Sequence, residues 1–264
     1  MDQNTLERLR SWRVESPDMP GMHTVIGPGT AECRAIQVFR LNLPAGKSFC
    51  LETGPLEKHA VLIHGKARLS PHFGLREEME RFDSFYLPGG EAVTITAEEN
   101  SIFYIPAAAC AGIGRPSFRK YDPMLPIGDI HQIHGAGVGR REVMFTLDPN
   151  TRASHLICGL TWGGTGAWTS WPPHQHEKDL EEVYCYFDMD PPAFGLHLSY
   201  LHAGTETIAA HPVRSGTMVA APRGYHPTVS SPVGRSTYLW ALAAFTPAQR
   251  SYDLAVTDPN FAQY

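Results

Sequence analysis

Short apolar runs alternate with turn residues along nearly the whole chain. Runs rich in Val, Ile, Tyr, Phe and Thr, such as RAIQVFRLNL, HAVLIHGKARLS, SIFYIPAAA, EVYCYFDM and STYLWALAAF, are separated by Gly and Pro. Such runs, bounded by turn residues, are typical of strands in a sandwich or barrel. We therefore predict an all-β protein with one helix near the N-terminus, over QNTLERLRSW, capped by Asn4 or Thr5.

The strand pattern occurs twice. Residues 83–108 and 215–244 each run strand, Pro-x-Gly turn, strand, turn and aromatic strand, and GKSFCLETGPLEKHAVLIHGKARLS corresponds to GAWTSWPPHQHEKDLEEVYCYFDMD before them. Because the matching segments lie far apart, they indicate two copies of one β domain and not a solenoid of short units. We predict domains at 1–125 and 126–264, joined within the loop-rich stretch 114–141.

Composition and charge narrow the function classes. The net charge of −5 comes without basic blocks, which predicts no nucleic-acid and no anionic membrane partner. No apolar run approaches ~20 residues, and the polar N-terminus is not typical of a signal peptide. Five widely spaced cysteines without a CxxC predict free thiols in a reducing compartment, and so a cytoplasmic location. GAGVGR has no βαβ pattern around it and is interpreted as a connector, not a phosphate loop.

Histidines in two segments suggest a metal site. In SWPPHQHEKDLEEVYCYFD, His174 and His176 are two residues apart, so on a strand both imidazoles point to one face. His226 follows a turn in which Pro222 fixes φ and Gly224 permits a tight bend. With a carboxylate near position 182, three imidazoles and one carboxylate suit zinc, iron, manganese, nickel or copper.

These motifs resemble those of a known superfamily. HxH, a glutamate entering an aromatic strand, and a Pro-x-Gly turn before a histidine resemble the two metal motifs of the cupins, except that only Tyr225 separates Gly224 from His226. With the repeat, the resemblance implies a bicupin of two tandem jelly-roll β-barrels. GxWTSWPPHxHE, EEVYxYFDM, GYHPTV and GRREV resemble the family of 5-deoxy-glucuronate isomerases and 5-keto-4-deoxyuronate isomerases, most densely over 140–259.

The resemblance implies a ligand set of His174, His176, Glu182 and His226. Glu181 has the commonest cupin spacing from His176, but Glu182 directly precedes Val-Tyr, as the ligand does in this family, and shares the parity of the histidines. We favour Glu182 and leave Glu181 open. The N-terminal copy has no HxH and carries Ala92 roughly at the place of His226, so we expect one metal site, in the C-terminal copy.

The family implies a reaction as well. We expect aldose–ketose isomerisation of a small deoxy-uronate, from 5-deoxy-glucuronate to 5-dehydro-2-deoxy-gluconate in inositol breakdown. The ion would be divalent, zinc first, with manganese, iron or nickel as alternatives, and would stabilise an enediolate. Alternatives are a 5-keto-4-deoxyuronate isomerase of pectin breakdown, a cupin dioxygenase, and a binding protein without catalysis.

Further roles are predicted from proximity to the motifs. Glu181 and Tyr225 are the catalytic candidates, with Tyr184 and Tyr186 as further proton-transfer groups. A substrate carboxylate calls for a cation; the nearest along the sequence are Arg152, Arg214 and Arg223. Trp162, Trp168 and Trp171 flank the HxH motif as cavity walls or core residues, and His197 is expected to be a core histidine. We expect no organic cofactor. A homo-oligomer is compatible with the sequence.

Overall fold

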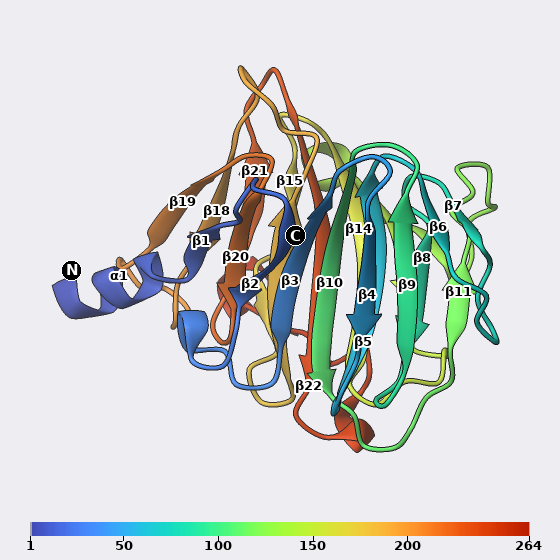
Figure 1. The fold of residues 1–264 in the computed structure, drawn as a ribbon. Helices are drawn as coiled ribbons and strands as arrows, with labels where there is room; N and C mark the ends of the chain where they lie inside the picture. The colour runs from blue at the N-terminus through green and yellow to red at the C-terminus, as the bar shows by residue number, and fades with distance from the viewer. Residues whose placement is uncertain (1, 264) are drawn as a thin grey trace.

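Two large antiparallel sheets dominate the computed structural model, which describes residues 2–263 (Figure 1). The seven-stranded sheet has the order β1 (Arg13–Glu15), β20 (Thr217–Ala221), β17 (Leu180–Tyr186), β22 (Arg235–Ala244), β14 (Leu156–Thr165), β13 (Arg141–Leu147) and β12 (His131–His134). The six-stranded sheet has the order β11 (Ser117–Arg119), β8 (Ser84–Leu87), β5 (Leu56–His64), β10 (Ser101–Ala109), β3 (Gln37–Leu43) and β2 (Gly21–Ile26). The prediction of a chain built mainly from strands is confirmed.

Three smaller sheets accompany them. One four-stranded sheet contains β4 (Ser48–Glu52), β9 (Ala92–Ala97), β6 (Ala67–Leu69) and β7 (Glu78–Met79). The other contains β15 (Trp168–Thr169), β21 (Thr228–Ser230), β18 (Gly195–Ser199) and β19 (Ala209–Val213). A two-stranded ribbon joins β16 (His174–Gln175) to β23 (Val256–Thr257). Each large sheet is therefore accompanied by a small one formed from the same half of the sequence.

Helical structure is sparse. The predicted N-terminal helix is α1 (Gln3–Arg10), but its cap is Asp2, whose carboxylate accepts the backbone N–H of Asn4 at 3.1 Å. The prediction of Asn4 or Thr5 as the cap is thus wrong by two to three positions, because the helix begins earlier than the apolar pattern suggests. The 3₁₀ turns are η1 (Thr30–Glu32), η2 (Gly137–Gly139), η3 (Pro247–Gln249) and η4 (Pro259–Phe261).

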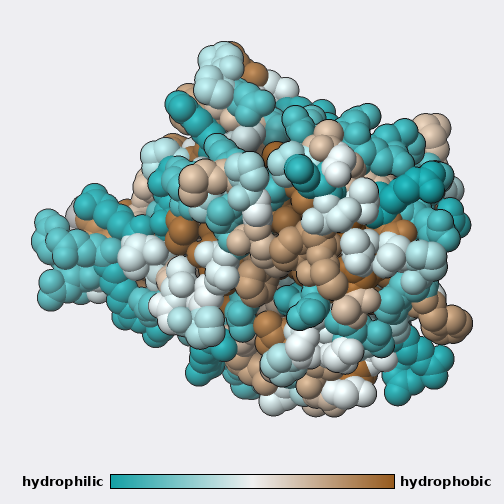
Figure 2. Space-filling model, viewed as in Figure 1, coloured by the Kyte–Doolittle hydropathy of each residue, from teal (hydrophilic) through white to brown (hydrophobic). Residues whose placement is uncertain are grey.

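Buried apolar side chains form three cores. The central core combines residues of both large sheets, such as Val61, Ile63 and Val183. The first interior combines the six-stranded sheet with the β4–β9–β6–β7 sheet, and the second interior combines the seven-stranded sheet with β19. Hydrophilic residues dominate the outline of the face in Figure 2, with hydrophobic residues between them over its middle. The large sheets are therefore buried on both faces, which explains their nearly continuous apolar runs.

Strand alternation decides which core each side chain enters. On β17, Val183 and Cys185 lie in the central core, whereas Tyr184 and Tyr186 lie in the second interior. Successive side chains of a strand point to opposite faces. The odd positions of β17 thus face the other half of the chain, and the even positions face the second interior.

The first half of the sequence contributes one strand to the large sheet of the second half. β1 pairs antiparallel with β20, with Arg13 opposite Val219, so residues near the N-terminus extend the sheet of the second half. β11 pairs with β8 of the first half, and β12 pairs with β13 of the second. The chain therefore passes from one large sheet to the other between β11 and β12, within the stretch 114–141.

A buried glutamate of the first half forms hydrogen bonds with the backbone of the second half. Glu57, on β5, is fully buried. Its carboxylate accepts the backbone N–H groups of Ser154, His155 and Leu156, each at 2.7 Å, and the hydroxyl of Tyr86 at 2.6 Å. Four donors satisfy a charge that would otherwise be costly to bury.

A glutamate of the second half likewise accepts backbone N–H groups, in this case those of the first half. Glu181, on β17, accepts the backbone N–H groups of Arg34, Ala35 and Ile36 at 3.0, 2.7 and 3.1 Å. It corresponds to Glu57 in the sequence repeat, where LEKHAVLI matches LEEVYCYF. We call these two contacts the reciprocal glutamate clamps.

Candidate metal site

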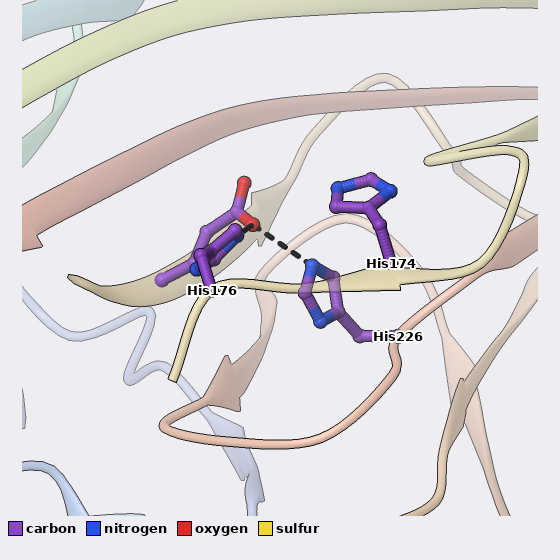
Figure 3. Close-up of side chains that lie close together, drawn as sticks. His174, His176 and His226 are labelled. Atoms are coloured by element: carbon purple, nitrogen blue, oxygen red, sulfur yellow. Dashed lines mark hydrogen bonds and ion pairs between the residues drawn. The ribbon is translucent and has the colours of Figure 1, made fainter. Parts of the chain in front are cut away.

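Four side chains with metal-ligating atoms converge at the edge of the second interior. One donor atom from each of His174, His176, Glu182 and His226 lies within 4.8 Å of the others. Figure 3 shows the three labelled imidazoles turned toward one another, with ring centroids 4.9–5.9 Å apart. The structure therefore brings together the four residues that the sequence nominated as ligands.

The first two histidines come from a very short strand. β16 contains His174 and ends before His176, and it is held by pairing with β23, where His174 lies opposite Thr257. The carbonyl of His176 then accepts the N–H of Asp179 and of Leu180, at 3.0 and 2.9 Å, which starts β17. The HxH segment thus leads through one tight turn into the strand that carries the glutamate.

The third histidine depends on a glycine turn between β20 and β21. Gly224 has φ +70°, and a Cβ there would lie 2.4 Å from the carbonyl oxygen of Tyr200. Only glycine fits both the conformation and the space. The N–H of Gly224 donates to the carboxylate of Glu177 at 3.0 Å, which links this turn to the residue directly after His176.

Backbone carbonyls orient two of the imidazoles. Nδ1 of His174 lies 2.9 Å from the carbonyl oxygen of Pro172, and Nδ1 of His226 lies 3.0 Å from that of Gly224. An Nδ1–H that donates to a carbonyl leaves the lone pair on Nε2, on the side of the cluster. Metal-binding histidines are commonly oriented by such contacts.

The structure distinguishes the two neighbouring glutamates. Oε2 of Glu182 lies 3.0 Å from Nε2 of His176 and 3.1 Å from Nε2 of His226. Glu181 points to the opposite face of β17, into its clamp. The prediction of Glu181 as a catalytic group is not supported, because strand alternation turns its carboxylate away from the cluster and three backbone N–H groups already occupy it.

The protonation states favour ligation. Burial, then the neighbouring His226 and His176, lowers the pKa of His174 to about 3. Burial alone would raise the pKa of Glu182, but contacts with His176 and His226 outweigh it and bring that pKa below its usual range. Metal binding requires neutral imidazoles and an ionised carboxylate.

One donor atom of the cluster also lacks a satisfying contact. Nε2 of His226 is buried and has no partner with hydrogen-bond geometry among the described residues, although Glu182 lies close. A buried polar atom without a partner is costly. A divalent ion accepting this lone pair would satisfy it, so the four side chains fit such an ion in chemistry and spacing.

The two glutamates allow a matched test. Glu182→Gln should weaken metal binding by at least ~10-fold, since it removes a charged ligand, whereas Glu181→Gln should keep full metal content but unfold at lower denaturant concentration. Metal analysis of both purified variants, with urea titration, separates the roles. Loss of metal in Glu181→Gln with retention in Glu182→Gln would reverse the assignment.

The cluster borders a cavity of about 210 Å³. Beyond the three predicted ligands His174, His176 and Glu182, the cavity wall combines aromatic side chains with polar ones. These include His134, Arg141, Trp171, Tyr184, Tyr238, Trp240 and Tyr252. A pocket that combines aromatic and polar side chains beside a metal-type cluster is suited to a small polar ligand.

Other predicted site residues lie elsewhere. Tyr225 stacks on Tyr200, with ring centroids 5.0 Å apart, and is outside the described lining of the cavity, because the next residue, His226, is the one that turns inward. The prediction of Tyr225 as a catalytic group is therefore not supported. Trp171 lines the cavity, whereas Trp162 packs against Phe82 in the central core.

The three arginines nominated for a substrate carboxylate are exposed and outside the described cavity lining. They are Arg152, Arg214 and Arg223, the last of which pairs with Glu32. Tyr184, the proton-transfer candidate that remains, lines the cavity, and His197 is fully buried, with Nδ1 2.9 Å from the hydroxyl of Tyr186. The prediction of a core histidine at 197 is confirmed.

Sequence reasoning missed two polar cavity residues. Arg141 lies in GRREV and His134 in the loop-rich stretch, both more than 30 residues before His174. They reach the cavity because β12 pairs with β13, which places His134 opposite Arg141 at one end of the seven-stranded sheet. The GRREV motif was the sequence feature that could have pointed to Arg141. Its distance from the histidines in sequence, however, does not indicate that they share a cavity.

Nearly the whole chain is similar to known proteins. Residues 12–262 match the model of the KduI/IolB family. A curated relative from Geobacillus kaustophilus (strain HTA426), named 5-deoxy-glucuronate isomerase, is 29% identical, with 74% of each chain covered. One of the same name from Bacillus subtilis (strain 168) is 28% identical, covering 75% of this chain and 77% of its own.

Solved structures extend the likeness to the fold. An IolB-like protein from Salmonella typhimurium LT2 has a TM-score of 0.80 at 23% identity, covering 95% of this chain and 98% of its own. Oxalate decarboxylase from Lactobacillus farciminis has a TM-score of 0.60 at 11% identity, covering 92% and 86%. That of Bacillus subtilis, a protein with Mn(II) centres, has a TM-score of 0.57 at 12% identity, covering 92% and 77%. At these identities the likeness is one of fold.

Proposed function

Since this chain belongs to the KduI/IolB family, we propose that it is a metal-dependent aldose–ketose isomerase that converts 5-deoxy-glucuronate to 5-dehydro-2-deoxy-gluconate in inositol breakdown. The observation that carries the proposal is the four-donor cluster at the border of a small aromatic cavity. Relatives covering about three quarters of the chain carry the name of this activity.

Some residues of the site would bind a metal ion, and others would bind the substrate. His174, His176, Glu182 and His226 would hold a divalent ion, with zinc first and manganese, iron or nickel as alternatives. When bound, such an ion supplies positive charge next to the substrate oxygens, where an enediolate develops negative charge. The aromatic walls would exclude water from the reacting carbons.

Two further cavity residues suit the proton transfer. Burial raises the pKa of Tyr184 well above its ordinary value, so its hydroxyl, 3.1 Å from Oγ of Ser170, stays protonated and can donate. Burial, then the charge of Arg141, lowers the pKa of His134, so this imidazole is neutral at neutral pH. Its Nε2 lies 2.7 Å from Oε1 of Gln132, which leaves Nδ1 free to accept a proton.

The proposal includes the domain architecture and the cellular location. We propose that the halves are tandem cupin barrels, 1–125 and 126–264, in which the second carries the site. Within residues 2–263, no helix has the length and apolarity to cross a membrane. The five thiols are free, which supports the proposed reducing, cytoplasmic environment.

The fold also supports a second candidate function, an oxygen-dependent reaction. Oxalate decarboxylases share this fold, and a protein of that kind contains Mn(II) centres. An oxygen-dependent reaction at the same four residues would consume dioxygen during turnover. Within the isomerase class, 5-keto-4-deoxyuronate is the competing substrate.

The experiment is turnover of both uronates by metal-loaded protein in deuterated water. We expect 5-deoxy-glucuronate to isomerise without an added organic cofactor and without oxygen uptake. Proton transfer through an enediolate should place deuterium on the newly formed CH2OH carbon. Full retention of the substrate hydrogen there would reject the enediolate step but keep the isomerase. Turnover of neither uronate, with oxygen consumed on another substrate, would reject the isomerase.

A further inference from the structure

One charged residue of the cavity is not accounted for by the metal cluster. Arg141, at the start of β13, is half-buried and lines the cavity together with Val143, the next residue on the same face of the strand. Its neighbour Arg140 is exposed. The sequence therefore places two arginines side by side and directs only the second into the cavity.

Arg141 is hydrogen-bonded to the segment that leads into the cluster. Its Nη1 donates to the carbonyl oxygen of Trp171 at 2.9 Å. Trp171 is three residues before His174, so the chain between them spans at most ~11 Å. The guanidinium and three members of the metal-type cluster thus border one and the same cavity.

The Arg141 guanidinium forms no ion pair within residues 2–263. Its recorded partners are two carbonyl oxygens, that of Trp171 and, more weakly, that of Gly139 at 3.4 Å. Other arginines of this structure pair with carboxylates, as the half-buried Arg119 does with Asp148 and Arg81 with Asp188. A half-buried guanidinium that meets only carbonyls keeps N–H donors available for an anion.

From this geometry we infer that Arg141 binds the substrate carboxylate and so selects acids over neutral sugars of the same shape. The inference rests on the proposed function, because it takes the ligand to be a deoxy-uronate. The planar fork of an arginine fits a carboxylate through two parallel hydrogen bonds. With the carboxylate held there, the aldehyde end of the chain is directed toward His174, His176 and Glu182.

Paired substrates test the inference. 5-Deoxy-glucose has a hydroxymethyl group in place of the carboxylate and is otherwise the same aldose. Arg141→Gln should lower kcat/KM for 5-deoxy-glucuronate ~10- to 100-fold, mainly through KM, and leave kcat/KM for 5-deoxy-glucose unchanged. Arg141→Lys, which keeps the charge but not the fork, should fall between. Arg140→Gln is the matched control and should match the wild type on both substrates, with full metal content in every variant.

The outcomes separate this inference from the proposed function. An equal loss on both substrates would assign Arg141 a structural role through Trp171 and overturn the inference, as would an unchanged KM. If wild-type protein isomerises neither uronate, the proposed function fails. Calorimetric binding of glucuronate to metal-loaded protein then decides about Arg141: binding lost in Arg141→Gln but kept in Arg140→Gln supports the anion site, and equal binding in both variants overturns it.

Discussion

His176→Ala protein should retain little metal and lose isomerase activity on the order of 10³-fold or more, because charge stabilisation by the ion contributes several kcal/mol to catalysis. His176 is a buried member of the cluster, and its ring centroid lies 5.1 Å from that of His226 and 5.9 Å from that of His174. Metal analysis of the purified variant and steady-state kinetics on 5-deoxy-glucuronate give the two measurements.

His202→Ala is a suitable control for this experiment. His202 is exposed and outside the cluster, so its variant should keep both metal and activity. A His176→Ala protein that keeps one equivalent of metal would show that the four residues are not the ligand set. Retained metal with lost activity would instead make His176 a substrate-contacting residue.

Glu57→Gln should lower the free energy of unfolding by about 3 kcal/mol, although the residue is far from any predicted ligand in sequence. The amide keeps one acceptor oxygen but turns an NH2 group toward backbone N–H donors. Some of the donors from Tyr86, Ser154, His155 and Leu156 would then be buried without a partner. Urea titration followed by tryptophan fluorescence and by circular dichroism measures the loss.

Glu99→Gln supplies the comparison for the clamp. Glu99 is exposed in the turn before β10, and its substitution should change the unfolding midpoint very little. If Glu57→Gln unfolded at the same urea concentration as Glu99→Gln, the clamp would contribute nothing measurable. Coincident unfolding curves from the two probes would further indicate that both halves unfold together.

Local pattern was sufficient to predict several features of this molecule. The alternation of apolar runs and turn residues predicted an all-β chain, and the period of two favoured Glu182 over Glu181 as the ligand. Gly224 predicted the tight turn before His226, which its positive φ confirms. Each of these inferences depends on residues within about ten positions of one another, where strand geometry fixes the relation.

The misassigned features depend on contacts between distant segments. Glu181 was a catalytic candidate because it is close to the motifs in sequence, but its carboxylate accepts the backbone N–H groups of residues 34–36. Arg141 was missed because the route from GRREV to the cavity passes through strand pairing across the seven-stranded sheet. Backbone N–H groups and strand order leave little trace in the side-chain pattern of a single sequence.

The reciprocal glutamate clamps restrict how the two halves can diverge after a duplication. Glu181 and Glu182 are consecutive on β17, so the residue held by the loop 34–36 is covalently next to a predicted ligand. A mutation in that loop would move β17 and change the position of the Glu182 carboxylate, although the loop itself carries no ligand. Selection for activity therefore extends into the first half of the chain. A second half expressed alone would leave Glu181 without its backbone N–H partners, on an uncovered face of the strand that carries Glu182.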